Sequence, residues 1–150
     1  MKRQRLPDSA KDIDEKDSYQ DKKIKKKILI ADDHPGIQDI FSIIFENAGF
    51  AIEIKENGED LLKNKFTLPD VFLIDKQLSG YDGLDICRHL KNQGRTKNIP
   101  VIMISASPNI GSLSKEAGAD AFIEKPFEIK DLLRLVNFYA DDREEPNSNY

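Results

Sequence analysis

Short apolar runs alternate along the chain with stretches whose apolar residues recur at helical spacing. Runs that suit buried strands stand at residues 28–31, 71–74 and 101–104, and weaker ones at 51–55 and 121–123. Between them, apolar residues lie three or four positions apart, which predicts amphipathic helices. These helices are expected near residues 37–48, 58–62, 84–90, 110–117 and 129–136. The pattern predicts five strands and five helices in strict alternation over residues 26–140.

Such an alternation indicates the fold class. Parallel strands that are joined through helices almost always take right-handed crossovers, and the helices then cover both faces of the sheet. We therefore expect an α/β protein with a doubly wound, five-stranded parallel sheet of the (βα)5 type.

The two ends of the chain lack this pattern. Residues 1–27 hold ten Lys/Arg and six Asp/Glu, a net charge of +4, whereas residues 28–150 hold 13 and 21, a net charge of −8. Few apolar residues and no periodicity predict a disordered charged arm over residues 1–25 and a flexible tail over 141–150. For the basic run Lys22–Lys27, a solvated arm is favoured over contact with an acidic partner or nucleic acid.

Composition narrows the class of protein. A chain of 150 residues suits one domain, and it contains neither an apolar run long enough to span a membrane nor a secretory signal. The single Cys87 excludes an intramolecular disulfide and fits a reducing compartment. The expectation is a soluble, cytoplasmic, single-domain protein.

Polar residues fall where the predicted strands end. Asp32 and Asp33 follow the first strand, Asp75 the third and Ser105 the fourth, and Lys125 lies just past the fifth. In an open parallel sheet these ends meet at one edge, which is where such sheets bind ligands. We therefore expect three carboxylates, a hydroxyl and an ammonium group to converge there.

This combination indicates a particular chemistry. Carboxylates a few ångströms apart repel one another unless a cation joins them, and Mg²⁺ with oxygen ligands is the economical choice. Such an ion keeps positions for water and phosphate oxygens. Lys125 and Ser105 are then suited to hold a phosphoryl group on Asp75.

The chain resembles a known family in these pieces and in their order. They are Asp32-Asp33, Asp75, Gly80-Tyr81-Asp82-Gly83, Ser105-Ala106, and Lys125-Pro126 after Phe122. Over about 115 residues the chain is similar to the receiver domain of two-component response regulators, the CheY-like family, which has a flavodoxin-like fold.

The resemblance implies roles for the acidic residues. Asp75 would be the phosphoacceptor and also a metal ligand. Asp33 would bind Mg²⁺ directly and Asp32 mostly through water, and the main-chain carbonyl of Gln77 would complete the protein ligands.

It also implies a switch. Ser105 and Lys125 would hold the phosphoryl oxygens, the Lys125-Pro126 peptide bond would be cis, and Phe122 would stand at the switch-aromatic position. The chain departs from the common pattern at Ser79, where proline is usual, and at Phe122, which lacks the hydroxyl of tyrosine.

The function that follows is that of a receiver protein in a phosphorelay two-component system. It would accept a phosphoryl group on Asp75 from a sensor histidine kinase or a histidine phosphotransfer protein. Because this is self-modification, the protein is not expected to be a turnover enzyme. No output domain is expected after residue 140, unless the sequence is a piece of a longer chain. The output partner would be a protein, which would contact the face formed by helix 110–117, strand 121–123 and helix 129–136. Direct binding to DNA or to a membrane is not expected.

Several residues also have a purely structural reading. Asp32 could cap the first helix, Ser105 could be a turn residue, Lys125 a surface lysine and Phe122 a core residue. We expect Cys87 to be a small buried hydrophobe. We expect His34 to be a loop residue beside the acidic pocket rather than a metal ligand, because Mg²⁺ prefers oxygen, and His89 to be solvated off the apolar face.

Other functions compete with the receiver. A relay intermediate that passes the phosphoryl group to a second histidine protein would use the same residues. A haloacid-dehalogenase-like phosphatase would need a second acid two residues after Asp75, where Gln77 stands. A flavodoxin-like cofactor carrier would need a neutral phosphate loop where Asp32-Asp33-His34-Pro35 stands, and no nucleotide-binding glycine motif is present.

Overall fold

The computed structural model describes residues 25–142. The predictions for the charged arm and for most of the tail fall on residues 1–24 and 143–150, which lie outside the described residues. Five parallel strands form one sheet with the lateral order β2-β1-β3-β6-β7. The strands are β1 (Lys27–Ala31), β2 (Ala51–Lys55), β3 (Val71–Asp75), β6 (Val101–Ser105) and β7 (Ala121–Glu124).

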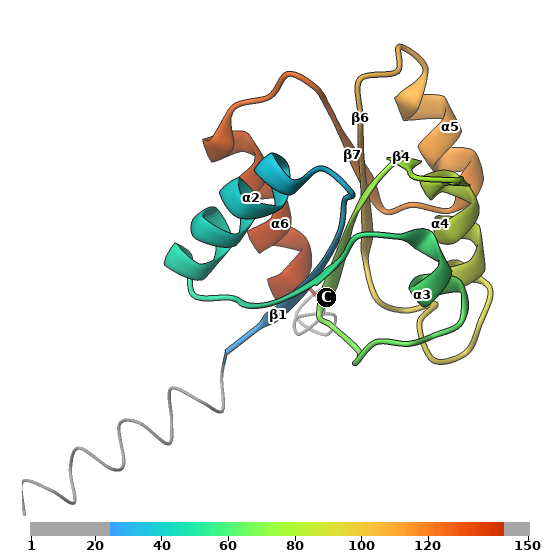
Figure 1. Ribbon diagram of the computed structural model, residues 1–150, viewed down its shortest axis with the longest axis horizontal. Coiled ribbons are helices and arrows are strands. Elements are labelled where there is room, and N and C mark those ends of the chain that lie inside the picture. The colour runs from blue at the N-terminus through green and yellow to red at the C-terminus, as the bar shows by residue number, and fades with distance from the viewer. Residues whose placement is uncertain (1–24, 143–150) are drawn as a thin grey trace, which may run out of the picture.

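Helices cover both faces of this sheet (Figure 1). They are α2 (Pro35–Asn47), α3 (Gly58–Leu62), α4 (Gly83–Lys91), α5 (Ile110–Ala117) and α6 (Ile129–Asp142). Helices α2 and α6 pack on one face, and α3, α4 and α5 pack on the other. The predicted doubly wound α/β fold is confirmed.

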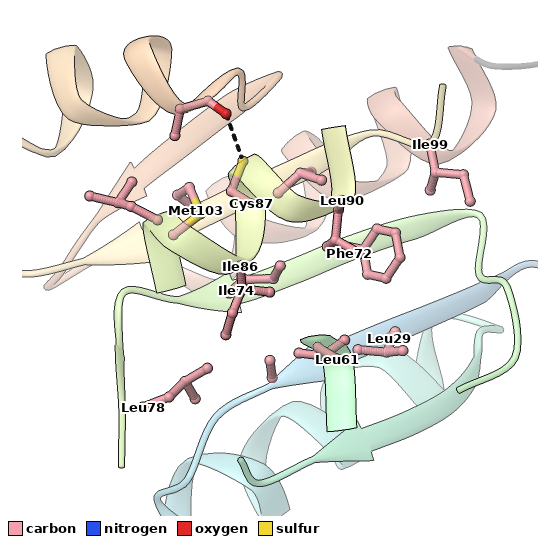
Figure 2. Close-up of a cluster of buried hydrophobic side chains, with 14 of the residues drawn as sticks. Leu29, Leu61, Phe72, Ile74, Leu78, Ile86, Cys87, Leu90, Ile99 and Met103 are labelled. Atoms are coloured by element: carbon pink, nitrogen blue, oxygen red, sulfur yellow. Dashed lines mark hydrogen bonds between the residues drawn. The ribbon is translucent and has the colours of Figure 1, made fainter. Parts of the chain in front are cut away.

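The central strands divide their side chains between two cores because successive residues of a strand point to opposite faces. In β3, Phe72 and Ile74 belong to the core under α3, α4 and α5, whereas Val71 and Leu73 belong to the core under α2 and α6. Figure 2 shows the first of these cores, with the Cys87 thiol donating to the Ala117 carbonyl at 3.6 Å. Cys87 is buried, as expected of a small hydrophobe.

A two-stranded hairpin was missed by the sequence analysis. Strands β4 (Gln77–Leu78) and β5 (Tyr81–Asp82) pair antiparallel directly after β3. Gly80 takes a positive φ of 76°, which lets two residues close the turn. Gly83 follows so closely that a Cβ there would collide with the Asp75 carbonyl oxygen. The hairpin is thereby held against the end of β3.

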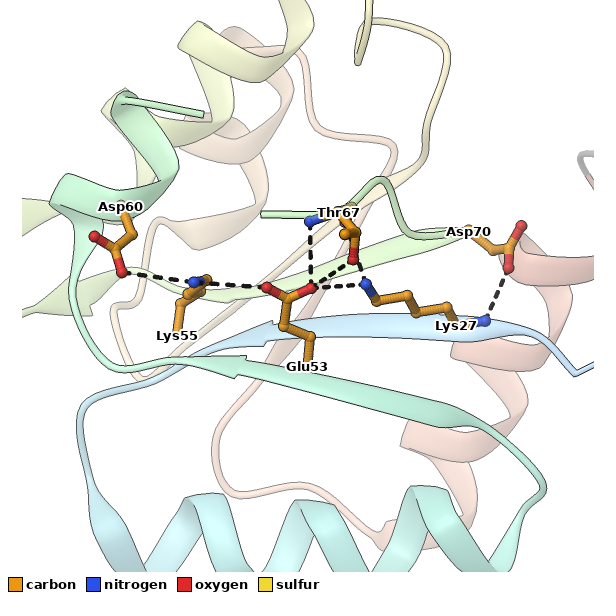
Figure 3. A network of polar contacts seen from close by, with 6 residues as sticks. All are labelled: Lys27, Glu53, Lys55, Asp60, Thr67 and Asp70. Carbon is orange, nitrogen blue, oxygen red and sulfur yellow. Dashed lines mark hydrogen bonds and ion pairs between the residues drawn. The ribbon is translucent and has the colours of Figure 1, made fainter. Parts of the chain in front are cut away.

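An ion-pair network lies along β2 and the start of β1 (Figure 3). Glu53 accepts from Lys27 Nζ at 2.7 Å and from Thr67 Oγ1 at 2.9 Å, and it lies 3.5 Å from Lys55 Nζ. Lys55 also lies 3.6 Å from Asp60. This network ties the segment before β3 to the edge of the sheet.

Among the described helices, none combines the length and the apolar character that crossing a membrane requires.

Candidate functional site

The predicted residues meet at the carboxyl edge of the sheet. The register pairs Ala31 with Ile74 and Asp75 with Ile104, so Asp32 follows β1 at the level where β3 ends in Asp75. Ser105 ends β6, and the Lys125 amide donates to the Ser105 carbonyl at 2.9 Å, which extends the pairing of β6 with β7. The parallel arrangement therefore brings four strand ends into one place.

Asp75 is held on both of its carboxylate oxygens. Oδ2 accepts from Lys125 Nζ at 2.7 Å, and Oδ1 accepts from the Gln77 amide at 2.8 Å. The residue is only 6% exposed, and it lies in a hollow of about 240 Å³ that Ser105 and Lys125 also line. One acidic oxygen is thus paired with a cation 50 residues away in sequence, beside space for a small group.

Asp32 is buried more deeply and is less well satisfied. Its Oδ1 accepts from the His34 amide at 2.8 Å, whereas Oδ2 is buried without a hydrogen-bond partner. Burial raises the pKa of Asp32 from its ordinary value to about 6, the His34 amide opposes this rise, and the negative charge of Asp75 adds to it. The alternative that Asp32 caps α2 is wrong, because His34 is the N-cap and its Nδ1 accepts from the Ile37 amide at 3.4 Å.

Asp33 departs from the expected convergence. Its Oδ2 accepts from Ser79 Oγ at 2.6 Å, and Ser79 belongs to the turn of the β4–β5 hairpin. Within residues 25–142, no group of three or more Asp, Glu, His or Cys side chains is arranged to hold a metal ion by itself. The charge of Asp75 acts on Asp32, whereas Asp33 is oriented by the turn between β4 and β5.

The donor set fits a hard divalent cation. The unpartnered Oδ2 of Asp32 is a buried acceptor, and a buried acceptor without a partner costs free energy. Mg²⁺ is commonly bound through one or two carboxylates and several waters, so it does not require a cage of three acidic side chains. The residues present therefore suit the predicted metal.

Ser105 and Lys125 occupy the positions that the sequence predicts. Ser105 is buried and its Oγ accepts from the Ser107 amide at 2.9 Å, which orients the hydroxyl in the loop before α5. The Lys125–Pro126 peptide bond is cis, as the resemblance implies. The hydroxyl and the ammonium group both line the hollow beside Asp75.

Phe122 is exposed rather than in the core. Its side chain on β7 is 44% exposed, and its ring lies over Gly111 in the first turn of α5. A Cβ on Gly111 would lie 3.1 Å from Cζ of this ring. Asn109 is the N-cap of α5, and its side chain makes no hydrogen bond to the first turn of the helix. The element beside Phe122 therefore has a weak start.

Other residues serve the site in ways that sequence reasoning missed. Gln38 of α2 donates its side-chain amide to the Asp32 carbonyl at 2.5 Å, and Ser79 contacts Asp33. Neither contact has a local sequence signal, although Ser79-Gly80 between Leu78 and Tyr81 is a hairpin-turn signal. Contrary to the prediction from sequence, His89 is not fully solvated but partly buried, because its Nε2 lies 3.3 Å from Asn64 Oδ1.

Comparison with known proteins identifies the family. Residues 28–137 match the family model described as response regulator receiver domain. The chain belongs to this family. The match spans the five sheet strands apart from Lys27 and reaches Asn137 in α6, so it includes every strand end at the carboxyl edge described above.

Curated relatives of this receiver domain are larger proteins. The DNA-binding dual master transcriptional regulator RpaA of Synechocystis is 34% identical over 113 residues, which are 73% of this chain and 47% of that protein. The DNA-binding response regulator MtrA of Mycolicibacterium smegmatis is 31% identical over 116 residues, 75% of this chain and 50% of that protein. The chain spans about half the length of the curated relatives it matches.

Solved receiver domains share the fold. A CheY-like receiver domain protein from Methanospirillum hungatei superposes with a TM-score of 0.74 at 28% identity, covering 82% of this chain and 99% of that one. The receiver domain of a sensor histidine kinase from Pseudomonas aeruginosa, which has magnesium coordinated in its active site cleft, superposes with a TM-score of 0.70 at 21% identity. It covers 77% of this chain and 98% of its own.

Proposed function

We propose that this receiver domain is a phosphorylation-controlled switch in a phosphorelay two-component system, with Asp75 as the phosphoacceptor. One observation carries the proposal. Asp75 is a buried carboxylate that is bonded to Lys125 Nζ at 2.7 Å and opens on a hollow of about 240 Å³ that Ser105 also lines. The arrangement supplies an oxygen nucleophile, a cation and a hydroxyl donor around space for one phosphoryl group.

The chemical step transfers the phosphoryl group to Asp75 from a phosphohistidine of a kinase or phosphotransfer protein. A carboxylate oxygen of Asp75 attacks phosphorus in line, the new O–P bond forms as the N–P bond breaks, and the histidine nitrogen keeps the electron pair. Lys125 Nζ moves from the carboxylate to a phosphoryl oxygen. Ser105 Oγ donates to another, as charge-assisted hydrogen bonds favour.

Magnesium is the proposed cofactor, because a hard divalent cation offsets the charge of the carboxylates and of the phosphoryl oxygens. Asp33, Asp75 and the Gln77 carbonyl would hold it directly, and Asp32 mostly through water. The buried Oδ2 of Asp32 supports this set, and the magnesium of the Pseudomonas receiver domain is consistent with it. Asp32 would orient a water ligand of the ion, and Gln38 holds the Asp32 main chain through its hydrogen bond to the Asp32 carbonyl.

The switch connects Ser105 with Phe122. When Ser105 moves toward a phosphoryl oxygen, it vacates space between β6 and α5 that the exposed ring of Phe122 enters. Because Phe122 has no hydroxyl, the two ring positions differ through apolar burial, worth roughly 1.5–3 kcal/mol. Helix α5, whose N-cap has no side-chain hydrogen bond, is the element that responds to phosphorylation.

The proposed partners are a sensor histidine kinase or histidine phosphotransfer protein for input, and a protein for output. The output surface is the face of α5, β7 and α6, where Phe122 and Phe138 are exposed aromatic side chains. The net charge of −8 over residues 28–150 opposes contact with the DNA backbone by this domain. The protein would be a cytoplasmic, self-modifying switch rather than a turnover enzyme, and no membrane contact is proposed.

A relay intermediate is the second candidate function. It would accept and release the phosphoryl group through the same residues and would need no response at Phe122. The phosphatase alternative is not supported, because Gln77 has no carboxylic acid to protonate a leaving group.

Acetyl phosphate with Mg²⁺ tests the proposal. Wild-type protein should gain one phosphoryl group by intact mass, and Asp75→Asn should gain none. Asp39→Asn is the matched control because Asp39 is exposed on α2. Equal labelling of Asp75→Asn and wild type would show that the phosphoacceptor is wrongly assigned.

A further inference from the structure

A hydrogen bond between Ser79 and Asp33 joins two loops of the site. Ser79 Oγ donates to Asp33 Oδ2 at 2.6 Å across a separation of 46 residues. Asp33 follows β1, whereas Ser79 stands in the two-residue turn between β4 and β5. The contact therefore links the loop after one central strand to the hairpin after its neighbour in the sheet.

The position of Ser79 is set by a hairpin that is fastened at its base. Lys76 Nζ lies 3.2 Å from Asp82 Oδ2, and the Gly83 amide donates to the Lys76 carbonyl at 2.6 Å. Gly80 closes the tip with its positive φ. The hydroxyl of Ser79 thus reaches Asp33 from a defined support rather than from a long free loop.

The orientation of the Asp33 carboxylate rests on this contact, whereas main-chain amides orient its two acidic neighbours. Asp32 and Asp75 each accept a main-chain amide two residues along, from His34 and Gln77. Among residues 25–142, Ser79 is the one donor seen on the Asp33 carboxylate, and it occupies a single oxygen. A carboxylate has acceptor sites on both oxygens, so Oδ1 stays open to a cation while Oδ2 is held.

We propose that Ser79 is a positioning residue for magnesium binding, because its hydroxyl orients Asp33 with one oxygen open to the ion. This inference rests on the proposed function. Hydrogen bonds from outer residues orient metal ligands and commonly change metal affinity when they are removed. Receiver domains usually have proline at this position, and proline has no side-chain donor. This receiver domain can therefore orient its metal ligand in a way that the common pattern cannot.

The expected effect is a change in Mg²⁺ affinity at unchanged fold. Because the Ser79–Asp33 bond is exposed, its loss should weaken binding by about 3- to 10-fold, which is less than the roughly 10- to 100-fold typical of such contacts. Ser79→Thr keeps the hydroxyl and should bind within about twofold of wild type. The stability of the metal-free domain should not follow this order, since the bond is solvent-exposed.

The experiment is calorimetric titration of the full chain with MgCl₂ at constant pH and ionic strength. It compares wild type, Ser79→Ala and Ser79→Thr. Ser112→Ala is the matched control, because Ser112 is also exposed and donates one hydrogen bond, to the Asn109 carbonyl at 3.3 Å, away from the carboxylates. Thermal unfolding without Mg²⁺ checks that each variant folds, and beryllofluoride at saturating Mg²⁺ checks that Asp75 still binds a phosphoryl mimic.

The outcomes separate this inference from the proposed function. Weaker Mg²⁺ binding by Ser79→Ala, with recovery in Ser79→Thr, supports the positioning role. Ser79→Ala binding Mg²⁺ as tightly as wild type overturns it, and so does Ser79→Thr binding as weakly as Ser79→Ala. If wild type takes neither Mg²⁺ nor beryllofluoride, the proposed function itself fails.

Discussion

Two groups of charged side chains on the same sheet each contain a carboxyl group whose pKa is shifted, and the two shifts have opposite directions. Burial alone would raise the pKa of Glu53, but hydrogen bonds from Lys27 and Thr67 outweigh it and lower that pKa (Figure 3). Burial of Asp32 is only partly offset by the His34 amide, so the pKa of Asp32 rises to about 6, and one of its oxygens has no partner. The carboxylate of Glu53 is paired with two lysines, whereas at the strand ends Lys125 is bonded to Asp75 and one oxygen of Asp32 has no partner.

This difference separates a structural charge cluster from a functional one. Hydrogen-bonded ion pairs fasten the chain, and adding a ligand to them gains little. An incompletely satisfied acidic site costs stability in the free protein and recovers it when a cation or a phosphoryl group arrives. Neutralising an acidic residue should therefore stabilise the domain at Asp32 and destabilise it at Glu53.

Removing the cation of the site should have the largest effect. Lys125→Ala deletes the ammonium group that is 2.7 Å from Asp75, and charge-assisted bonds are worth roughly 1.5–3 kcal/mol. Beryllofluoride affinity in saturating Mg²⁺ should fall by about 10- to 100-fold, as measured by amide NMR shifts. Lys130→Ala, on the exposed start of α6, is the control. Undiminished affinity in Lys125→Ala would remove Lys125 from the phosphoryl site.

Neutralising Asp32 should stabilise the metal-free domain. Asp32→Asn removes a buried charge whose pKa is raised to about 6, and relieving this should be worth roughly 1–3 kcal/mol. Urea unfolding in EDTA at pH 7 should therefore give a higher free energy of unfolding for Asp32→Asn than for wild type. Asp39→Asn should leave it unchanged. If Asp32→Asn is instead less stable than wild type, the ionised Asp32 carboxylate has favourable partners that compensate for its burial.

The raised pKa of Asp32 also predicts that the stability of the domain depends on pH. The folded pKa of Asp32, about 6, exceeds the unfolded value of roughly 3.9, so the folded state binds more protons between these values. The stabilisation from protonated Asp32 is complete below the unfolded pKa and is lost as pH rises through about 6. Wild-type stability relative to Asp32→Asn should therefore decline from pH 4 to pH 7 in EDTA. Equal slopes for both proteins would contradict the raised pKa.

Neutralising Glu53 should change the free energy of unfolding in the opposite direction from Asp32→Asn, and by less. Glu53→Gln removes the charge that accepts from Lys27 and Thr67, which should cost about 1 kcal/mol in the free energy of unfolding. The loss should shrink at high salt and should not depend on Mg²⁺. Urea unfolding at two salt concentrations measures it, and a gain in stability would end the contrast between the two clusters.

The smallest effect is expected at the switch element. Gly111→Ala improves helix propensity in α5, but its Cβ would lie 3.1 Å from Cζ of Phe122. Because this ring is exposed and can shift, we expect a net gain of about 0.5 kcal/mol and a smaller beryllofluoride response at residues 106–117. A loss of stability would mean that the ring of Phe122 is fixed where it lies.

Much of the site could be read from the sequence because its residues stand at strand ends. Asp75 follows four buried apolar residues, and Ser105 does the same in β6, so hydrophobic runs mark where each polar side chain emerges. Both lie at the predicted edge. The β4–β5 hairpin was missed because two-residue strands are too short for a periodic signal, although Gly80 marks their turn.

The sequence by itself determined the alternation of strands and helices, the buried faces, and which polar residues end the strands, because burial imposes periods that are visible within each segment. Only the tertiary structure decided which oxygens are paired. Ser79 reaches Asp33 over 46 residues, Lys125 reaches Asp75 over 50, and Asp32 Oδ2 is left without a partner. Those outcomes depend on how separate loops pack at one edge of the sheet, and no local pattern of residues encodes that packing.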